Sequence, residues 1–197
     1  MKNAELIMRM AKENNGVITS AKVTESGLSR GTLKYLTDIG KLERSARGVN
    51  IIAEVWDEKI YNLQVQFKRG IFSGETALFL NDLTDRTPNS YQMTFPIGYN
   101  VTSLKNENVK AVRAAKKLYE LGIITVLTPG GNPVKAYNKE KTLCDILRGR
   151  SNTDIQIVSD AFKQYVRSEN INIPLLSEYA KILRVEKKLR SYLEVLI

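Results

Sequence analysis

The sequence predicts an α+β fold in two domains, residues 1–56 and residues 57–197. Three observations lead to this prediction. Helix, glycine turn, helix and basic ribbon signals follow one another within residues 19–52. Strand and hairpin signals occupy the middle of the chain, and helical periodicity dominates from Asn138 onward. The first domain is therefore predicted to be a winged helix-turn-helix, and the second a mixed α/β domain with a helical C-terminal third.

The first domain is predicted to open with a helix and a short strand. Residues 3–14 place apolar side chains at helical spacing, so we expect an amphipathic helix that closes the domain core. Residues 17–18 are apolar and are predicted to form a strand that pairs with the basic ribbon. A short helix follows, and either Thr19 or Ser20 can cap it.

The second helix of this domain follows a turn at Gly27, and Ser29 is expected to cap it. At about 100° per residue, its core side carries Leu33, Leu36 and Ile39. An ordinary amphipathic helix with a solvated polar face has the same pattern, and the helix taken alone favours that plain interpretation. The opposite side carries Arg30, Gly31, Lys34, Tyr35 and Asp38.

The ribbon behind that helix favours DNA binding. It runs over residues 42–47, turns at Gly48 and returns over residues 49–52. Two arginines flank its turn of small residues, and guanidinium groups on a protruding ribbon commonly reach the DNA backbone or a minor groove. The predicted phosphate contacts come from Lys22, Arg44 and Arg47, and the predicted base-edge contacts from Arg30, Lys34 and Tyr35.

Composition narrows the classes of function. The 197 residues carry a net charge of +9, which favours a polyanionic partner. The chain has no histidine, so histidine-based triads and most zinc sites are excluded, and we expect neither a metal ion nor a cofactor. Its single cysteine, Cys144, is predicted to be a small core residue. No stretch is apolar enough to span a bilayer, so a soluble cytoplasmic protein is expected.

The second domain is predicted to begin with a helix over residues 57–69, and Ser73 can cap the next one. Residues 109–121 allow two interpretations, because alanine and lysine favour a helix while a strand that runs into a helical turn also fits. Strands are expected at residues 91–95, 123–127 and 134–137, the last two as a hairpin.

Two basic clusters in this domain could present a positive surface to nucleic acid or to an acidic protein. Solvated helix faces with nearby acidic partners explain each cluster slightly better. The clusters are Lys110, Arg113, Lys116 and Lys117, and then Lys181, Arg184, Lys187, Lys188 and Arg190.

Signals for an enzyme are weak. Glu140, Lys141 and Asp145 are the residue types of a metal-dependent nuclease centre, but any charged helix start provides their spacing. A nucleic-acid-processing enzyme therefore stays an alternative to DNA binding. A transcription regulator whose second domain senses a small ligand is another.

The chain resembles the AbiEi antitoxins of bacterial abortive-infection toxin–antitoxin systems, over nearly its whole length. The resemblance implies a non-enzymatic protein that binds inverted repeats in double-stranded DNA of its own promoter and represses its operon. It also implies that the protein counters a nucleotidyltransferase-like toxin without forming a stable complex, as part of phage resistance. Besides the N-terminal module, it rests on FPIGYN (residues 95–100), LGI (121–123) and VKAYNKEKTLCDIL (134–147).

Overall fold

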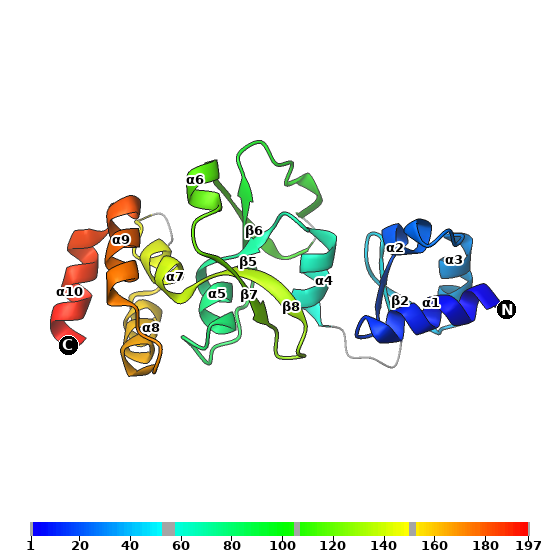
Figure 1. The fold of residues 1–197 in the computed structure, drawn as a ribbon, viewed down its shortest axis with the longest axis horizontal. Helices are drawn as coiled ribbons and strands as arrows, with labels where there is room; N and C mark the ends of the chain where they lie inside the picture. Colours follow the sequence, from blue (N-terminus) through cyan, green and yellow to red (C-terminus); the bar gives the residue numbers. More distant parts are fainter. Residues whose placement is uncertain (1, 53–57, 105–106, 150–152, 197) are drawn as a thin grey trace. The chain divides into compact units, whose positions relative to one another are not determined.

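A computed structural model of the chain confirms the expected α+β class (Figure 1). It describes residues 2–52, 58–104, 107–149 and 153–196. Within these ranges it contains ten α-helices, one short 3-10 helix and two β-sheets.

The chain divides into two compact units. The first comprises residues 1–68 together with the short segment 128–132, and the second comprises residues 69–127 and 133–197. The predicted boundary between residues 56 and 57 lies outside the described residues.

The first unit contains a three-stranded antiparallel sheet. Its strand order is β1-β3-β2, and Val17 pairs with Ile51, so the strand predicted at residues 17–18 does pair with the ribbon. In chain order the elements are α1 (Lys2–Glu13), β1 (Val17–Thr19), α2 (Ser20–Glu25), α3 (Gly31–Asp38), β2 (Leu42–Ala46), β3 (Val49–Ile52) and α4 (Lys59–Gln66).

Side chains from α1, α3 and the sheet form the core of this unit, and Ile7, Leu36 and Leu42 are almost fully buried there. The expectation that Ile39 faces the core is wrong, since its side chain is 45% exposed. Ile39 follows the last helical residue, and Gly40 then turns the chain at φ +70°, so the helical angle no longer applies.

A five-stranded sheet forms the centre of the second unit, with strand order β6-β5-β4-β8-β7. Two neighbouring pairs, β5 with β6 and β4 with β8, are parallel, and the other pairs are antiparallel. The strands are β4 (Ile71–Phe72), β5 (Tyr91–Pro96), β6 (Val109–Ala114), β7 (Ile123–Leu127) and β8 (Pro133–Tyr137).

The segment 109–121 adopts the second of its two expected conformations, a strand followed by a helical turn. Six residues of β6 pair in parallel with β5, from Tyr91 with Val109 to Pro96 with Ala114. This pairing outweighs the helical preference of alanine and lysine, because propensity is a weak bias that tertiary contacts override. The hairpin of β7 and β8 and the strand β5 lie where the sequence predicts them.

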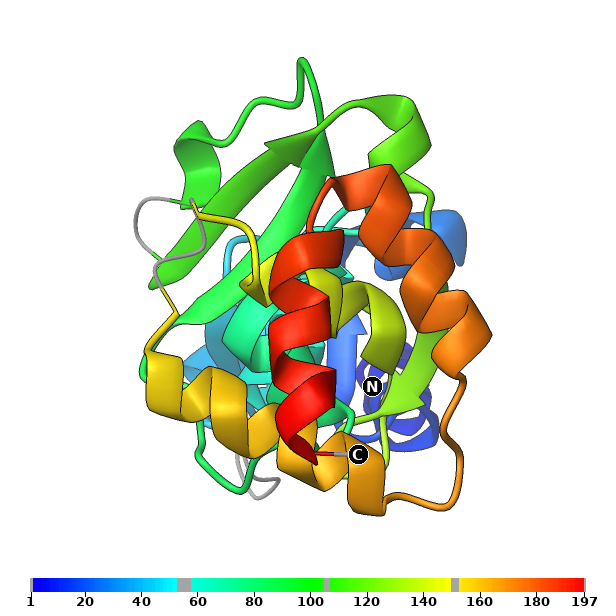
Figure 2. The same ribbon diagram turned by 90° about the vertical axis from the view of Figure 1, so that its left-hand side faces the viewer.

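Helices pack on the sheet and on one another to form the core of this unit. α5 contacts β5 and α7, and α7 contacts α8 and α9. Figure 2 shows α8, α9 and α10 gathered on one side of the sheet. Cys144 is fully buried in α7, as predicted. The helices are α5 (Gly74–Leu80), α6 (Lys116–Tyr119), α7 (Lys139–Ile146), α8 (Ile155–Arg167), α9 (Ile173–Leu183) and α10 (Glu186–Leu196), and the 3-10 helix is Thr102–Leu104.

Within the described residues, none of the helices has the length and apolar character needed to cross a bilayer.

Candidate nucleic-acid interface

The turn between α2 and α3 fixes the position of Arg30. Gly27 provides the positive φ that the turn requires, at +71°. Arg30 then stands at the N-cap of α3 instead of the predicted Ser29, whose Oγ accepts a hydrogen bond from the Gly31 N–H at 3.2 Å. The Nε of Arg30 donates to the Oγ1 of Thr24 at 2.8 Å. Arg30 is exposed at the start of α3, and this hydrogen bond ties its side chain back to α2.

The outward side of α3 is as polar as predicted. Leu33 and Leu36 are buried, while Lys34 is exposed and Tyr35 has 56% of its surface exposed. Lys34 lies one helical turn beyond Arg30, so the two cations lie on the same side of α3. A cationic and aromatic face of this kind suits contacts with phosphates and base edges.

The ribbon turn is tied to helix α2 by a hydrogen bond. Gly48 turns the chain between β2 and β3 at φ +78°, and its carbonyl accepts a hydrogen bond from the Ser20 N–H at 2.9 Å. Thr19 caps α2 by accepting from the Lys22 N–H at 3.1 Å, which settles the choice between Thr19 and Ser20. The exposed Arg47 directly precedes Gly48.

Helix α2 therefore links the ribbon turn to the start of α3. Ser20 contacts the ribbon turn, and Thr24, four residues later, contacts Arg30. Four residues are about 6 Å along a helix axis, so the two attachments lie about one helical turn apart. Arg30 and the ribbon turn next to Arg47 are brought together, and Lys22 belongs to the same helix. Arg44 is exposed on β2 beside Asn50, three residues before Arg47.

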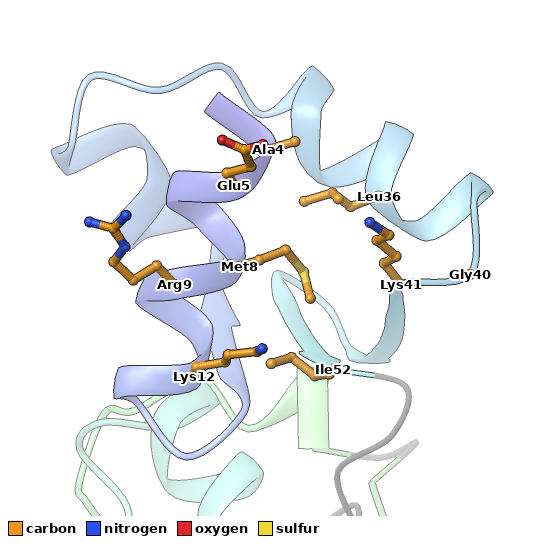
Figure 3. Close-up of a pocket in the computed structure, with 9 residues that line it drawn as sticks. All are labelled: Ala4, Glu5, Met8, Arg9, Lys12, Leu36, Gly40, Lys41 and Ile52. Atoms are coloured by element: carbon orange, nitrogen blue, oxygen red, sulfur yellow. The ribbon is translucent and has the colours of Figure 1, made fainter. Parts of the chain in front are cut away.

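A second feature of this unit is a pocket of about 540 Å³ between α1 and the end of α3 (Figure 3). Met8, Leu36 and Ile52 supply apolar lining, and Lys12 and Lys41 extend beside them. In the same view, Arg9 points away from Met8, on the far side of α1. Sequence reasoning did not single out this pocket.

In the second unit, the structure brings some of the predicted basic residues together. Lys110 and Arg113 of the first cluster line a pocket of about 290 Å³. Three residues of the second cluster, Arg184, Lys187 and Lys188, line a hollow of about 840 Å³. Arg148, which was not predicted, lines both. The remaining residues of the clusters are exposed outside these linings, namely Lys116, Lys117, Lys181 and Arg190.

Three residues of the YNKEKTLCD segment line the smaller pocket, namely Tyr137, Lys141 and Asp145. Lys141 is only 2% exposed, its ammonium is bonded to the Asp145 carboxylate, and it lies 4.4 Å from the ring centre of Tyr137. Burial lowers the pKa of Lys141, and the Asp145 carboxylate acts in the opposite direction. The spacing of four between these three residues was visible in the sequence, but the burial of the lysine was not.

The neighbouring Glu140 serves a different purpose. Its carboxylate accepts a hydrogen bond from the Tyr165 hydroxyl at 2.9 Å, and it is 7% exposed. Five residues separate Glu140 from Asp145, which places the two carboxylates about 140° apart around α7. Within the described ranges, no three Asp, Glu, His or Cys side chains gather closely enough to hold a metal ion.

Comparison with known proteins indicates a shared fold. No family model and no curated protein matches the chain. Among solved structures, the chain is similar to the crystal structure of the Rv2827c protein from Mycobacterium tuberculosis, with a TM-score of 0.61 and 16% sequence identity. The match covers 92% of this chain and 72% of that one. At this identity the likeness concerns the fold alone.

Proposed function

We propose that the chain is a DNA-binding transcriptional repressor of its own operon, and that its first unit is a winged helix-turn-helix. The order α1-β1-α2-α3-β2-β3, with an antiparallel sheet in the order β1-β3-β2, supports this assignment. In such modules the N-terminal residues of the second helix contact base edges. Arg30 occupies that position here.

The observation that carries the proposal is the double attachment of α2. Through Thr24 it holds Arg30, and through Ser20 it holds the ribbon turn next to Arg47. Arg30 and the turn that follows Arg47 are thereby tied to the same helix before any ligand binds, which lowers the entropy lost on binding. A duplex with one negative charge per about 1.7 Å of axis can engage both at once.

Gel shifts on the operon's own promoter test the proposal. We expect the double variant Arg30→Ala, Lys34→Ala to lose about 1–3 kcal/mol of specific binding per base contact removed. The matched control is Arg9→Ala, Lys12→Ala, which removes the same charge from α1. Equal losses in the two double variants would show that charge alone, and not this face, determines binding.

We further propose that the chain acts as an antitoxin in an abortive-infection system, which rests on the AbiEi resemblance. It would counter a nucleotidyltransferase-like toxin and would not itself be an enzyme. Co-expression with the toxin encoded beside it should restore growth, and the Arg30→Ala, Lys34→Ala variant should do so equally well under an external promoter. Toxicity that persists with the wild-type chain would refute this role.

The nuclease alternative receives less support, because Glu140 is engaged by Tyr165 and is separated from the Lys141–Asp145 pair. Incubation of the chain with DNA or RNA and Mg²⁺ should leave the nucleic acid intact. Cleavage that is lost in an Asp145→Asn variant would revive the alternative.

A further inference from the structure

The pocket of about 290 Å³ in the second unit has a composition that DNA repression does not explain. It lies between α7 and the β5–β6 edge of the sheet, where β6 is an edge strand. Its volume is near the lower limit of the roughly 300–1,000 Å³ that is usual for small-molecule pockets. A ligand of about the size of one mononucleotide, and no larger, matches that space.

Charge in this pocket strongly favours an anion. Among the described residues, the side chains on this face of the sheet and on α7 include three cations, Lys110, Lys141 and Arg148, and one carboxylate, Asp145. A formal excess of two positive charges is unusual around a pocket that is partly enclosed, because the buried Lys141 and the partly buried Arg148 lose hydration there. A dianion that enters would relieve this repulsion.

Lys141 is the central cation. It is almost fully buried, although lysine is rarely buried without a functional or structural reason. Asp145 and the Tyr137 ring stabilise its charge only in part, since burial still lowers its pKa. Arg148 lies 3.5 Å from the other oxygen of Asp145, so two cations share one carboxylate. A second anion beside Lys141 and Arg148 would complete the pairing.

Two buried hydroxyl groups line the pocket. Ser73 is 2% exposed and Thr94 is 5% exposed, and the Thr94 hydroxyl donates to the Ser73 Oγ at 2.9 Å. Ser73 stands at the N-cap of α5 but makes no side-chain capping bond there. Because a hydroxyl rotates, Ser73 can donate to an acceptor in the pocket. Hydroxyl, ammonium and guanidinium donors together are the set that recognises phosphate oxygens.

We propose that this pocket binds a phosphate monoester of up to mononucleotide size, with Lys141 and Arg148 contacting the phosphate oxygens and the Ser73 hydroxyl donating to one of them. Lys110 lies at the exposed rim and attracts the anion. This site is distinct from the α3 and ribbon face of the first unit, so it does not depend on the proposed function.

Isothermal titration of the full chain tests the site, with inorganic phosphate and adenosine monophosphate as probes and adenosine as the phosphate-free control. We expect adenosine monophosphate to bind and adenosine to bind at least ten-fold more weakly. The variant Lys141→Met, which keeps the volume of the side chain, should weaken binding about ten- to a hundred-fold. Lys181→Ala, which removes an exposed lysine outside the pocket, should leave the affinity unchanged.

Three results would overturn the proposal: no binding of either phosphate probe, equal binding of adenosine and its monophosphate, or equal losses in Lys141→Met and Lys181→Ala. Should Lys141→Met fail to fold, the variants Lys110→Ala, at the rim, and Arg148→Ala, at the phosphate, decide the question. Each should weaken binding several-fold, and wild-type affinity in both would refute the site. Amide resonances of Ser73 and Thr94 should shift on titration, and shifts confined to residues 184–188 would place the anion in the neighbouring hollow.

Discussion

The cations of the two units are held in different ways. Arg30, Lys34 and Arg47 of the first unit are exposed, and Arg30 is positioned by a single hydrogen bond to Thr24. Lys141 of the second unit is buried, bonded to Asp145 and stacked on Tyr137. Exposed cations keep their hydration and suit an extended polyanion, whose binding is driven by counterion release. A desolvated cation in a small pocket suits one defined anion, because its attraction is stronger and less screened.

The largest expected effect comes from removing the carboxylate of a buried ion pair, compared with removing the carboxylate of an exposed ion pair. Asp145→Ala should destabilise the chain by about 2–3 kcal/mol, because Lys141 would remain buried without its carboxylate. Asp145 is 20% exposed, which keeps the cost below the roughly 3–5 kcal/mol of fully buried pairs. The matched change Asp160→Ala breaks a surface pair with Lys163 at 3.5 Å and should cost under about 0.5 kcal/mol. Urea unfolding measures both, and similar costs would contradict the distinction.

Alkaline pH should also act on the second unit. Burial raises the pKa of the Cys144 thiol from 9.0 to about 12, so between these values the unfolded chain has lost a proton that the folded chain keeps. Stability should therefore fall as pH rises from about 9 to 12, by up to about 1.4 kcal/mol per pH unit from this group. Burial raises the pKa of Tyr137 as well, which adds a loss of the same sign above about pH 10. Cys144→Ala should show a shallower decline in urea unfolding at several pH values, and an unchanged slope would contradict this cause.

A substitution at Thr24 tests the hydrogen bond that attaches Arg30 to α2. Thr24→Val removes the hydroxyl that accepts from Arg30 and keeps the shape of the side chain. A net hydrogen bond contributes about 0.5–1.5 kcal/mol, so specific DNA affinity should fall about two- to ten-fold. Ser26→Ala is the control, since its hydroxyl bonds only the Lys22 carbonyl within α2. A greater loss in the control would mean that the integrity of α2, and not the position of Arg30, governs affinity.

The smallest expected effect concerns salt. Arg47→Ala should lower the slope of log Kobs against log salt concentration by about 0.9, the value of one phosphate contact. It should weaken binding to all DNA sequences alike, because phosphate contacts carry no sequence information. Fluorescence anisotropy at several salt concentrations measures the slope, and a selective loss on the operator alone would assign Arg47 to base contacts.

Sequence reasoning was strongest where structure is local. Gly27 and Gly48 adopt the positive φ values that turns require, so the helices and the ribbon next to these turns lie where they were predicted. It was weaker where partners are distant in the chain. β6 was ambiguous because its pairing with β5 decides its conformation, and the error at Ile39 arose because the helix had already ended.

The pocket of the second unit was the hardest feature to foresee. Lys141 and Asp145 were noticed for their residue types, but a lysine on a charged helix start gives no sign that it will be buried. Ser73 and Thr94 come from separate elements and meet only in the folded sheet. Arg148 was not predicted as a site residue. It lines two pockets whose basic residues come from segments that are far apart in the sequence.

NMR titration of the full chain with its operator duplex tests the central claim most directly, which is that α3 and the ribbon turn form one DNA-binding face. We predict that the amide resonances of Arg30, Lys34 and Arg47 shift together and first, at substoichiometric DNA. Shifts confined to Arg9 and Lys12 of α1, with those three resonances unmoved, would contradict the account.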